Sequence, residues 1–246
     1  RRISTSIYLI AIAVTDFCII FLLLTYWLMT DVIPREAMPE TTGCEAAAYL
    51  YRGFSLISTV LMISMTFDRF IAVCYPIKAK FWSTTRRAKL TCVLAPILCM
   101  VYAIPYYFTS KLEKNANMLC VTMMVKSDAY TVYTWVTLIF RSVITFVALM
   151  VMNIGVLRAL KRSRSLTSDS GTMSKREKQL SIVLLGITFS FLFFTMPLAV
   201  RDIIYQVIDE RASSRDYGVY FLSFHVTDKL NYTNSAVNFL FLAMAG

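Results

Sequence analysis

Long apolar segments separated by shorter polar ones make up most of the chain. Helices are expected at about residues 5–29, 46–72, 89–109, 130–160, 176–203 and 217–243. A helix of about 20 apolar residues crosses the roughly 30 Å hydrocarbon core of a bilayer. The pattern therefore predicts an all-α transmembrane bundle that forms a single domain over residues 1–246. The stretches between the helices, including a basic one at 78–89 and a polar one around residue 120, are expected to be loops.

Composition and charge support a membrane protein. The chain is 57% hydrophobic with a mean hydropathy of +0.60, values that a soluble domain of this length rarely reaches. Its net charge of +10 is unevenly distributed, because basic residues gather at the N-terminus, at 78–89 and at 158–178. Such segments stay on the cytoplasmic side under the positive-inside rule. We therefore expect a multi-pass plasma-membrane protein with cytoplasmic basic loops, which contacts the lipid bilayer and binds no nucleic acid.

An acid and an arginine end the helix expected at 46–72. Asp68 and Arg69 close its apolar run, and Pro76 predicts that the helix stops shortly afterwards. Charges cost little at the water boundary, so an incidental ion pair beside a membrane span is one interpretation. However, residues 68–76, Asp-Arg-Phe-Ile-Ala-Val-Cys-Tyr-Pro, resemble the Asp-Arg-Tyr segment of rhodopsin-like (class A) G-protein-coupled receptors, with Phe70 replacing Tyr. The resemblance implies six of that family's seven transmembrane helices, without the first helix and the C-terminal tail.

The resemblance assigns a G-protein-coupling switch to the cytoplasmic end of this helix. Its members are expected to be Asp68, Arg69 and Phe70. Glu177 lies where many members of the family carry an acid that pairs with the inner arginine, which implies a lock on the inactive state. A solvated Glu177 is the alternative, since exposed ion pairs contribute little to stability.

The helix expected at 176–203 carries a second stretch that is similar to a family motif. Residues 191–197, Phe-Leu-Phe-Phe-Thr-Met-Pro, resemble the sixth-helix pattern Phe-x-x-Cys-Trp-x-Pro, with Phe and Thr at the Cys and Trp positions. The resemblance implies an activation relay made of Phe191, Thr195, Pro197 and Asn238. Pro197 is expected to kink its helix. Phe191 is equally interpretable as an ordinary core residue.

Asp16 interrupts the first predicted helix near its middle. A lone carboxylate at this depth is costly and marks a functional site by default. Its context, Leu-Ile-Ala-Ile-Ala-Val-Thr-Asp at 9–16, resembles the second helix of class A receptors, where the matching Asp binds sodium. The resemblance implies an allosteric Na⁺ site made of Asp16, Ser58, Asn234, Ser235 and Asn238. Oxygen ligands suit a hard cation; a protonated or hydrogen-bonded Asp16 without an ion is the alternative. No cofactor is required.

Two cysteines lie on the side expected to face outward. Cys44 precedes the helix at 46–72 and Cys120 precedes the helix at 130–160. Disulfides form in such an oxidising compartment. Class A receptors pair a third-helix cysteine with one in the second outer loop, so the resemblance implies a Cys44–Cys120 disulfide.

A ligand pocket is expected among polar side chains in the outer halves of the helices. Its candidate residues are Tyr51, Arg52, Ser55, Arg141, Arg201 and Asp228. Arginine binds carboxylate in a bidentate manner, so the pocket suits an anionic or C-terminal carboxylate group. An internal salt bridge between an arginine and Asp228 is the alternative.

The last predicted helix refines the resemblance. Its Asn-Ser-x-x-Asn-Phe-Leu sequence at 234–240 is similar to invertebrate neuropeptide receptors of the FMRFamide type. The resemblance implies a receptor, not an enzyme, that binds an extracellular peptide and activates a heterotrimeric G protein. A six-span channel or transporter is the alternative, although the internal repeats typical of transporters are not visible.

Overall fold

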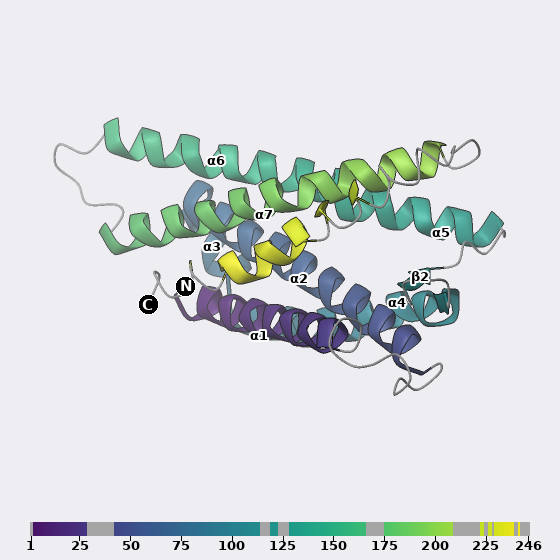
Figure 1. Ribbon diagram of the computed structural model, residues 1–246. Coiled ribbons are helices and arrows are strands. Elements are labelled where there is room, and N and C mark those ends of the chain that lie inside the picture. The colour runs from purple at the N-terminus through teal and green to yellow at the C-terminus, as the bar shows by residue number, and fades with distance from the viewer. Residues whose placement is uncertain are drawn as a thin grey trace.

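The computed structural model describes residues 2–28, 42–113, 119–122, 128–165, 175–208, 222–223, 226–227, 229–238 and 241. Within these ranges the chain forms a helical bundle (Figure 1). Its helices are α1 (Arg2–Trp27), α2 (Thr42–Cys74), α3 (Pro76–Trp82), α4 (Thr85–Thr109), α5 (Asp128–Leu138), α6 (Thr145–Ser165) and α7 (Lys175–Ile208). A π-helical segment, η3 (Ile139–Ile144), joins α5 to α6. Residues 229–238 are also helical.

Several of these helices are long and apolar enough to cross a membrane. In the described part of the chain there are five such stretches: Ser4–Thr25, Glu45–Cys74, Thr85–Thr109, Thr131–Lys161 and Ser181–Ile204. The all-α transmembrane bundle predicted from the apolar runs is thereby confirmed. The helix expected at 217–243 is described only in part, and its central residues 229–238 are helical.

Helix α2 runs through the middle of the bundle and contacts α1, α4 and α6 (Figure 1). Leu61, Met62 and Met65 of α2 are almost completely buried, as are Ile12 of α1 and Leu149 of α6. Residues 229–238, drawn in yellow, lie between α1 and α7. This placement brings polar residues of the last helix against α1 and α2.

The expectation of a loop at 78–89 is wrong, because most of this segment is helical. Helix α3 ends at Trp82 and α4 begins at Thr85. Pro76 occupies the first turn of α3, where a missing backbone N–H is not needed for an intrahelical bond. The Thr84 side chain caps α4 by accepting a hydrogen bond from the backbone N–H of Arg87, at 3.4 Å.

The polar segment around residue 120 contains a small antiparallel sheet rather than loop alone. Strands β1 (Ser110–Glu113) and β2 (Leu119–Thr122) pair with Leu112 opposite Cys120. The side chains of Cys44 and Cys120 lie outside the described residues, so their disulfide stays a prediction.

Candidate functional site

A cavity of about 230 Å³ opens between α2, η3, α6, α7 and residues 229–238. Its apolar lining includes Phe146, Val147, Phe191, Leu192, Met196 and Ile203. Its polar lining includes Ser55, Ser58, Arg141, Thr195, Asp202, Asn231 and Asn234. A concave, largely apolar site with a few convergent polar groups is typical of ligand-binding pockets. The cavity is therefore the candidate binding site.

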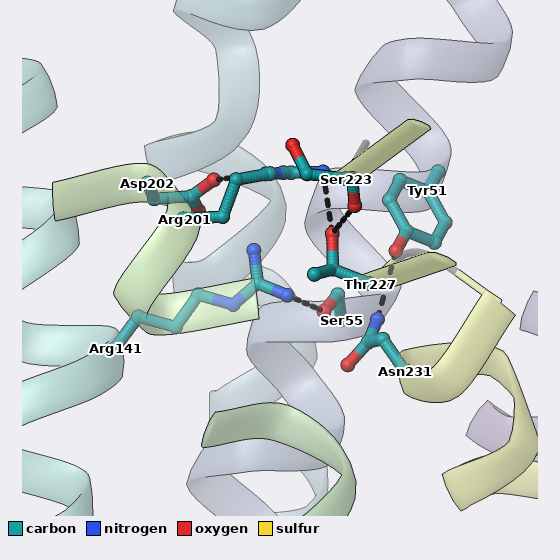
Figure 2. Close-up of polar contacts among 8 residues, drawn as sticks. All are labelled: Tyr51, Ser55, Arg141, Arg201, Asp202, Ser223, Thr227 and Asn231. Carbon is teal, nitrogen blue, oxygen red and sulfur yellow. Dashed lines mark hydrogen bonds and ion pairs between the residues drawn. The ribbon is translucent and has the colours of Figure 1, made fainter. Parts of the chain in front are cut away.

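Arg141 reaches this cavity from the π-helical segment η3. Its Nη2 donates a hydrogen bond to Ser55 Oγ at 2.9 Å, which links η3 to α2 (Figure 2). The Thr145 hydroxyl donates to the carbonyl of Phe140, five residues earlier, at 2.9 Å. Single π-helical turns inside α-helices often occur at functional sites. Two residues predicted for the pocket, Ser55 and Arg141, thus meet at its wall.

Tyr51, also predicted for the pocket, is held by the last helix. The Asn231 side chain donates from Nδ2 to the Tyr51 hydroxyl at 2.9 Å (Figure 2). The rings of Tyr51 and Tyr232 pack edge to face with centroids 5.7 Å apart. Asn231 lines the cavity and was not among the predicted pocket residues, because the sequence does not show which face of the last helix points into the bundle.

The other two candidate arginines have different partners. Arg201 is buried and binds Asp202 Oδ1 from Nη2 at 2.7 Å, while its Nη1 donates to Thr227 Oγ1 at 3.0 Å (Figure 2). The Arg52 guanidinium lies 5.2 Å from the ring centroid of Tyr106 in α4, a cation–π arrangement. Of the three arginines, Arg141 alone belongs to the cavity lining in the described part of the chain. Asp228 lies outside the described residues.

Asp16 lies at the meeting point of α1, α2 and the last helix. The carboxylate is 4% exposed and accepts hydrogen bonds from Ser58 Oγ (3.3 Å), Ser235 Oγ (3.0 Å) and Asn238 Nδ2 (2.9 Å). Among the described residues, none donates a hydrogen bond to the buried Oδ1 atoms of Asn234 and Asn238. Unpartnered buried acceptors are costly, and a hard cation favours oxygen ligands. The donor set therefore fits a sodium ion, and the structure brings four of the five predicted residues into direct contact.

The expected coupling switch lies near the other end of α2. Asp68 and Arg69 are both largely buried, and Asp68 Oδ2 accepts a hydrogen bond from Ser4 Oγ of α1 at 3.2 Å. Arg69 borders a narrow gap together with Asn153 of α6 and Ser181 of α7. The side chain of Glu177 lies outside the described residues, so its contact with Arg69 stays a prediction.

Phe70 packs against α6 at a position where that helix has no side chain. A Cβ atom added to Gly155 would collide with Cε2 of the Phe70 ring and lie 3.0 Å from its Cδ2. The ring also packs edge to face against Tyr75, with centroids 5.7 Å apart. The contact between α2 and α6 therefore depends on glycine at position 155.

The expected activation relay lies along α7. Phe191 is 6% exposed and borders the cavity, and Thr195 donates from its hydroxyl to the Phe191 carbonyl at 2.7 Å. Pro197 follows within the same helix, which continues to Ile208. Asn238 belongs instead to the Asp16 cluster, because its side-chain amide donates a hydrogen bond to the Asp16 carboxylate.

Comparison with known proteins supplies the family. The model of the 7 transmembrane receptor (rhodopsin family) matches residues 1–240. The FMRFamide receptor of Drosophila melanogaster is 25% identical over 202 residues, which cover 77% of this chain and 35% of that protein. The thyrotropin-releasing hormone receptor of Mus musculus is 32% identical, over 47% of this chain and 30% of that protein. The cholecystokinin receptor of Xenopus laevis is 27% identical, over 45% and 24%.

The matched segments span about a third or less of these relatives. The family match, in contrast, extends over almost the whole chain and includes the Asp16 cluster, the Asp68–Arg69 pair and the cavity. Proteins of this family are receptors and not enzymes. The chain belongs to the rhodopsin family of seven-transmembrane receptors.

Proposed function

We propose that this chain is the helical core of a receptor that binds an extracellular peptide and activates a heterotrimeric G protein. The observation that carries the proposal is that one helix, α2, both lines the cavity and carries Arg69. Ser55 at the cavity and Arg69 at the narrow gap are separated by about 21 Å along α2, at 1.5 Å per residue. One continuous element thus contacts a ligand-sized cavity and a buried arginine near the opposite end of the bundle.

The basic ends of the helices support the orientation of this receptor. Basic residues lie close to Arg69 in the sequence, at the α3–α4 corner and at the end of α6. Segments rich in basic residues remain on the cytoplasmic side of the membrane. The cavity then lies toward the outside, the side of the membrane on which the β1–β2 hairpin follows the end of α4. The protein is a multi-pass protein of the plasma membrane.

A peptide is the ligand class that the relatives support. The names of the three relatives are those of receptors for FMRFamide, thyrotropin-releasing hormone and cholecystokinin. A cavity of about 230 Å³ accommodates the end of a peptide rather than the whole of one. Arg141 and Asn231 supply hydrogen bonds to its polar groups, while Phe146 and Met196 surround an apolar side chain.

Helix α7 provides the mechanical link between the two ends. Phe191 and Thr195 of α7 border the cavity, and Ser181 and Leu185 of the same helix border the gap beside Arg69. A ligand that prefers one of two packings of α7 shifts the equilibrium toward it by its differential affinity. Displacement of α7 would widen the gap and allow a G protein to reach Arg69.

The Asp16 cluster would hold an allosteric sodium ion. Asp16, Ser58, Ser235 and the two asparagines 234 and 238 supply the oxygen atoms. When bound, the ion supplies a positive charge that offsets the buried carboxylate. Because the cluster ties α1 and α2 to the last helix, it would favour the compact packing of the bundle.

The test is ligand-stimulated nucleotide exchange by the full-length receptor. We expect a panel of amidated neuropeptides, beginning with FMRFamide, to contain a member that stimulates exchange on a reconstituted heterotrimeric G protein. The Arg69→Ala variant should keep peptide binding and lose most of the exchange. Peptide-triggered ion flux without exchange would contradict the proposal and favour a channel.

A further inference from the structure

The cavity that contains Arg141 continues as far as the Asp16 cluster. Ser58 and Ser235 line the cavity, and the same two hydroxyl groups donate hydrogen bonds to Asp16 Oδ1, at 3.3 and 3.0 Å. Asn234, whose Oδ1 is buried, lies on the cavity wall as well. The candidate ligand site and the candidate ion site therefore share one cavity wall.

Arg141 places a positive charge on the wall of this cavity. Among the described lining residues the other charged side chain is Asp202, whose carboxylate forms an ion pair with Arg201 at 2.7 Å (Figure 2). The Arg141 guanidinium instead donates to the Ser55 hydroxyl, at 2.9 Å. A neutral hydroxyl accepts the hydrogen bond without cancelling the charge. The charge of Arg141 therefore acts on other charged groups that enter the cavity.

The distance between Arg141 and Asp16 follows from their two serine partners on α2. Ser55 and Ser58 are three residues apart in this helix, so they share one face, with Cβ atoms about 5–6 Å apart. Ser55 binds the Arg141 guanidinium and Ser58 binds the Asp16 carboxylate, so the two charged groups are about 10 Å apart. Two unit charges at this distance inside a protein change an equilibrium constant about tenfold. A cation bound beside Asp16 is therefore repelled by Arg141.

We propose that Arg141 sets the sodium affinity of the Asp16 cluster, because its charge opposes a second cation on the same cavity wall. This inference rests on the sodium site proposed above and adds to it a residue that does not bind the ion. An anionic ligand group bound to Arg141 would offset the arginine charge and relieve the repulsion. Through this electrostatic contact, the anionic group and sodium strengthen each other's binding by the same factor. Arg141 thereby links the ion site to the occupant of the outer part of the cavity.

The experiment measures the sodium concentration that produces half of the sodium-dependent rise in Tm, using the purified full-length receptor without peptide. Sodium chloride replaces choline chloride at constant ionic strength, so that general screening stays equal. Arg141→Gln should lower this concentration about tenfold, because glutamine keeps a donor for Ser55 but removes the charge. Arg141→Lys keeps the charge and should stay within about twofold of wild type. A general loss of stability lowers Tm at every sodium concentration and does not imitate this shift.

Arg52→Gln is the matched control. It removes the same charge from α2, but Arg52 faces the Tyr106 ring and lies outside the cavity lining in the described part of the chain, so the half-maximal sodium concentration should stay within about twofold of wild type. Equal concentrations in wild type and Arg141→Gln, or an equal decrease in Arg52→Gln, would overturn the role of Arg141 and leave the sodium site intact. A sodium response that persists in Asp16→Asn/Arg141→Gln would also overturn it, because the ion would then bind elsewhere. Absence of a sodium response in wild type would overturn the ion site and this inference together.

Discussion

Replacing Gly155 by alanine should weaken the packing of α6 on α2. The new Cβ would collide with the Phe70 ring, whose Cε2 and Cδ2 both lie within its contact distance. The ring is rigid and is held on another edge by Tyr75, so it has little room to withdraw. The substitution therefore forces either the ring or the helix to shift.

The expected magnitude is a balance of two terms. Alanine stabilises a helix interior by about 1 kcal/mol relative to glycine. Overpacking of a filled core costs about 1–3 kcal/mol. We expect a net loss of about 1 kcal/mol, which lowers the Tm of a chain of this size by about 2–4 °C.

Gly53 provides the matched control in the same bundle. A Cβ at Gly53 would also collide with its neighbour, but that neighbour is the Sδ of Met100. Methionine has a flexible thioether end that adapts to crowding. Gly53→Ala should therefore leave the Tm unchanged or raise it slightly through the gain in helix propensity.

The assay is thermal unfolding of the full-length receptor in detergent, without ligand. In a Phe70→Ala background, the cost of Gly155→Ala should disappear, because the colliding ring is gone. Equal Tm values for Gly155→Ala and Gly53→Ala would refute the reasoning. A cost of Gly155→Ala that persists beside Phe70→Ala would refute it as well.

Three further predictions concern polar contacts. Sodium in place of choline should raise the Tm of wild type but not of Asp16→Asn; an unchanged sodium effect in the variant would exclude the proposed ion site. Ser4→Ala should lower the Tm by the equivalent of about 1–3 kcal/mol, because it removes a buried donor to Asp68; calorimetry of the purified receptor checks this. Arg141→Gln should weaken peptide binding at least about tenfold, whereas Arg52→Gln should change it much less; radioligand competition distinguishes them, and equal losses would contradict the assignment.

The Asp16 cluster shows what could be predicted from the sequence. A single carboxylate within an apolar span must find polar partners on other spans, because an unpaired charge there is costly. The family resemblance then named Ser58, Asn234, Ser235 and Asn238, and three of these four, Ser58, Ser235 and Asn238, bind Asp16 in the structure. The depth of Asp16 in the membrane follows from counting residues along its helix, whereas the identity of its partners came from the resemblance.

The short elements between the helices could not be predicted in the same way. Helix α3 and the β1–β2 hairpin lack the long apolar runs by which the membrane spans were recognised. Pro76 was interpreted only as the end of α2, although it also begins α3. A polar, charged composition is compatible with a loop, a short helix or a hairpin, and tertiary packing decides among them.

The sequence could not show which way the side chains of Arg52, Arg141 and Arg201 point, because this depends on the rotation of each helix about its axis as well as on depth in the membrane. Each lies in an apolar environment where a cation is costly, and each is stabilised differently. Asp202 neutralises Arg201, and the Tyr106 ring faces Arg52. Arg141, turned toward the cavity within a π-helical segment, bonds to a neutral hydroxyl that accepts its hydrogen bond without cancelling its charge. Arg141 is therefore the arginine through which we expect an anionic group of the peptide to bind.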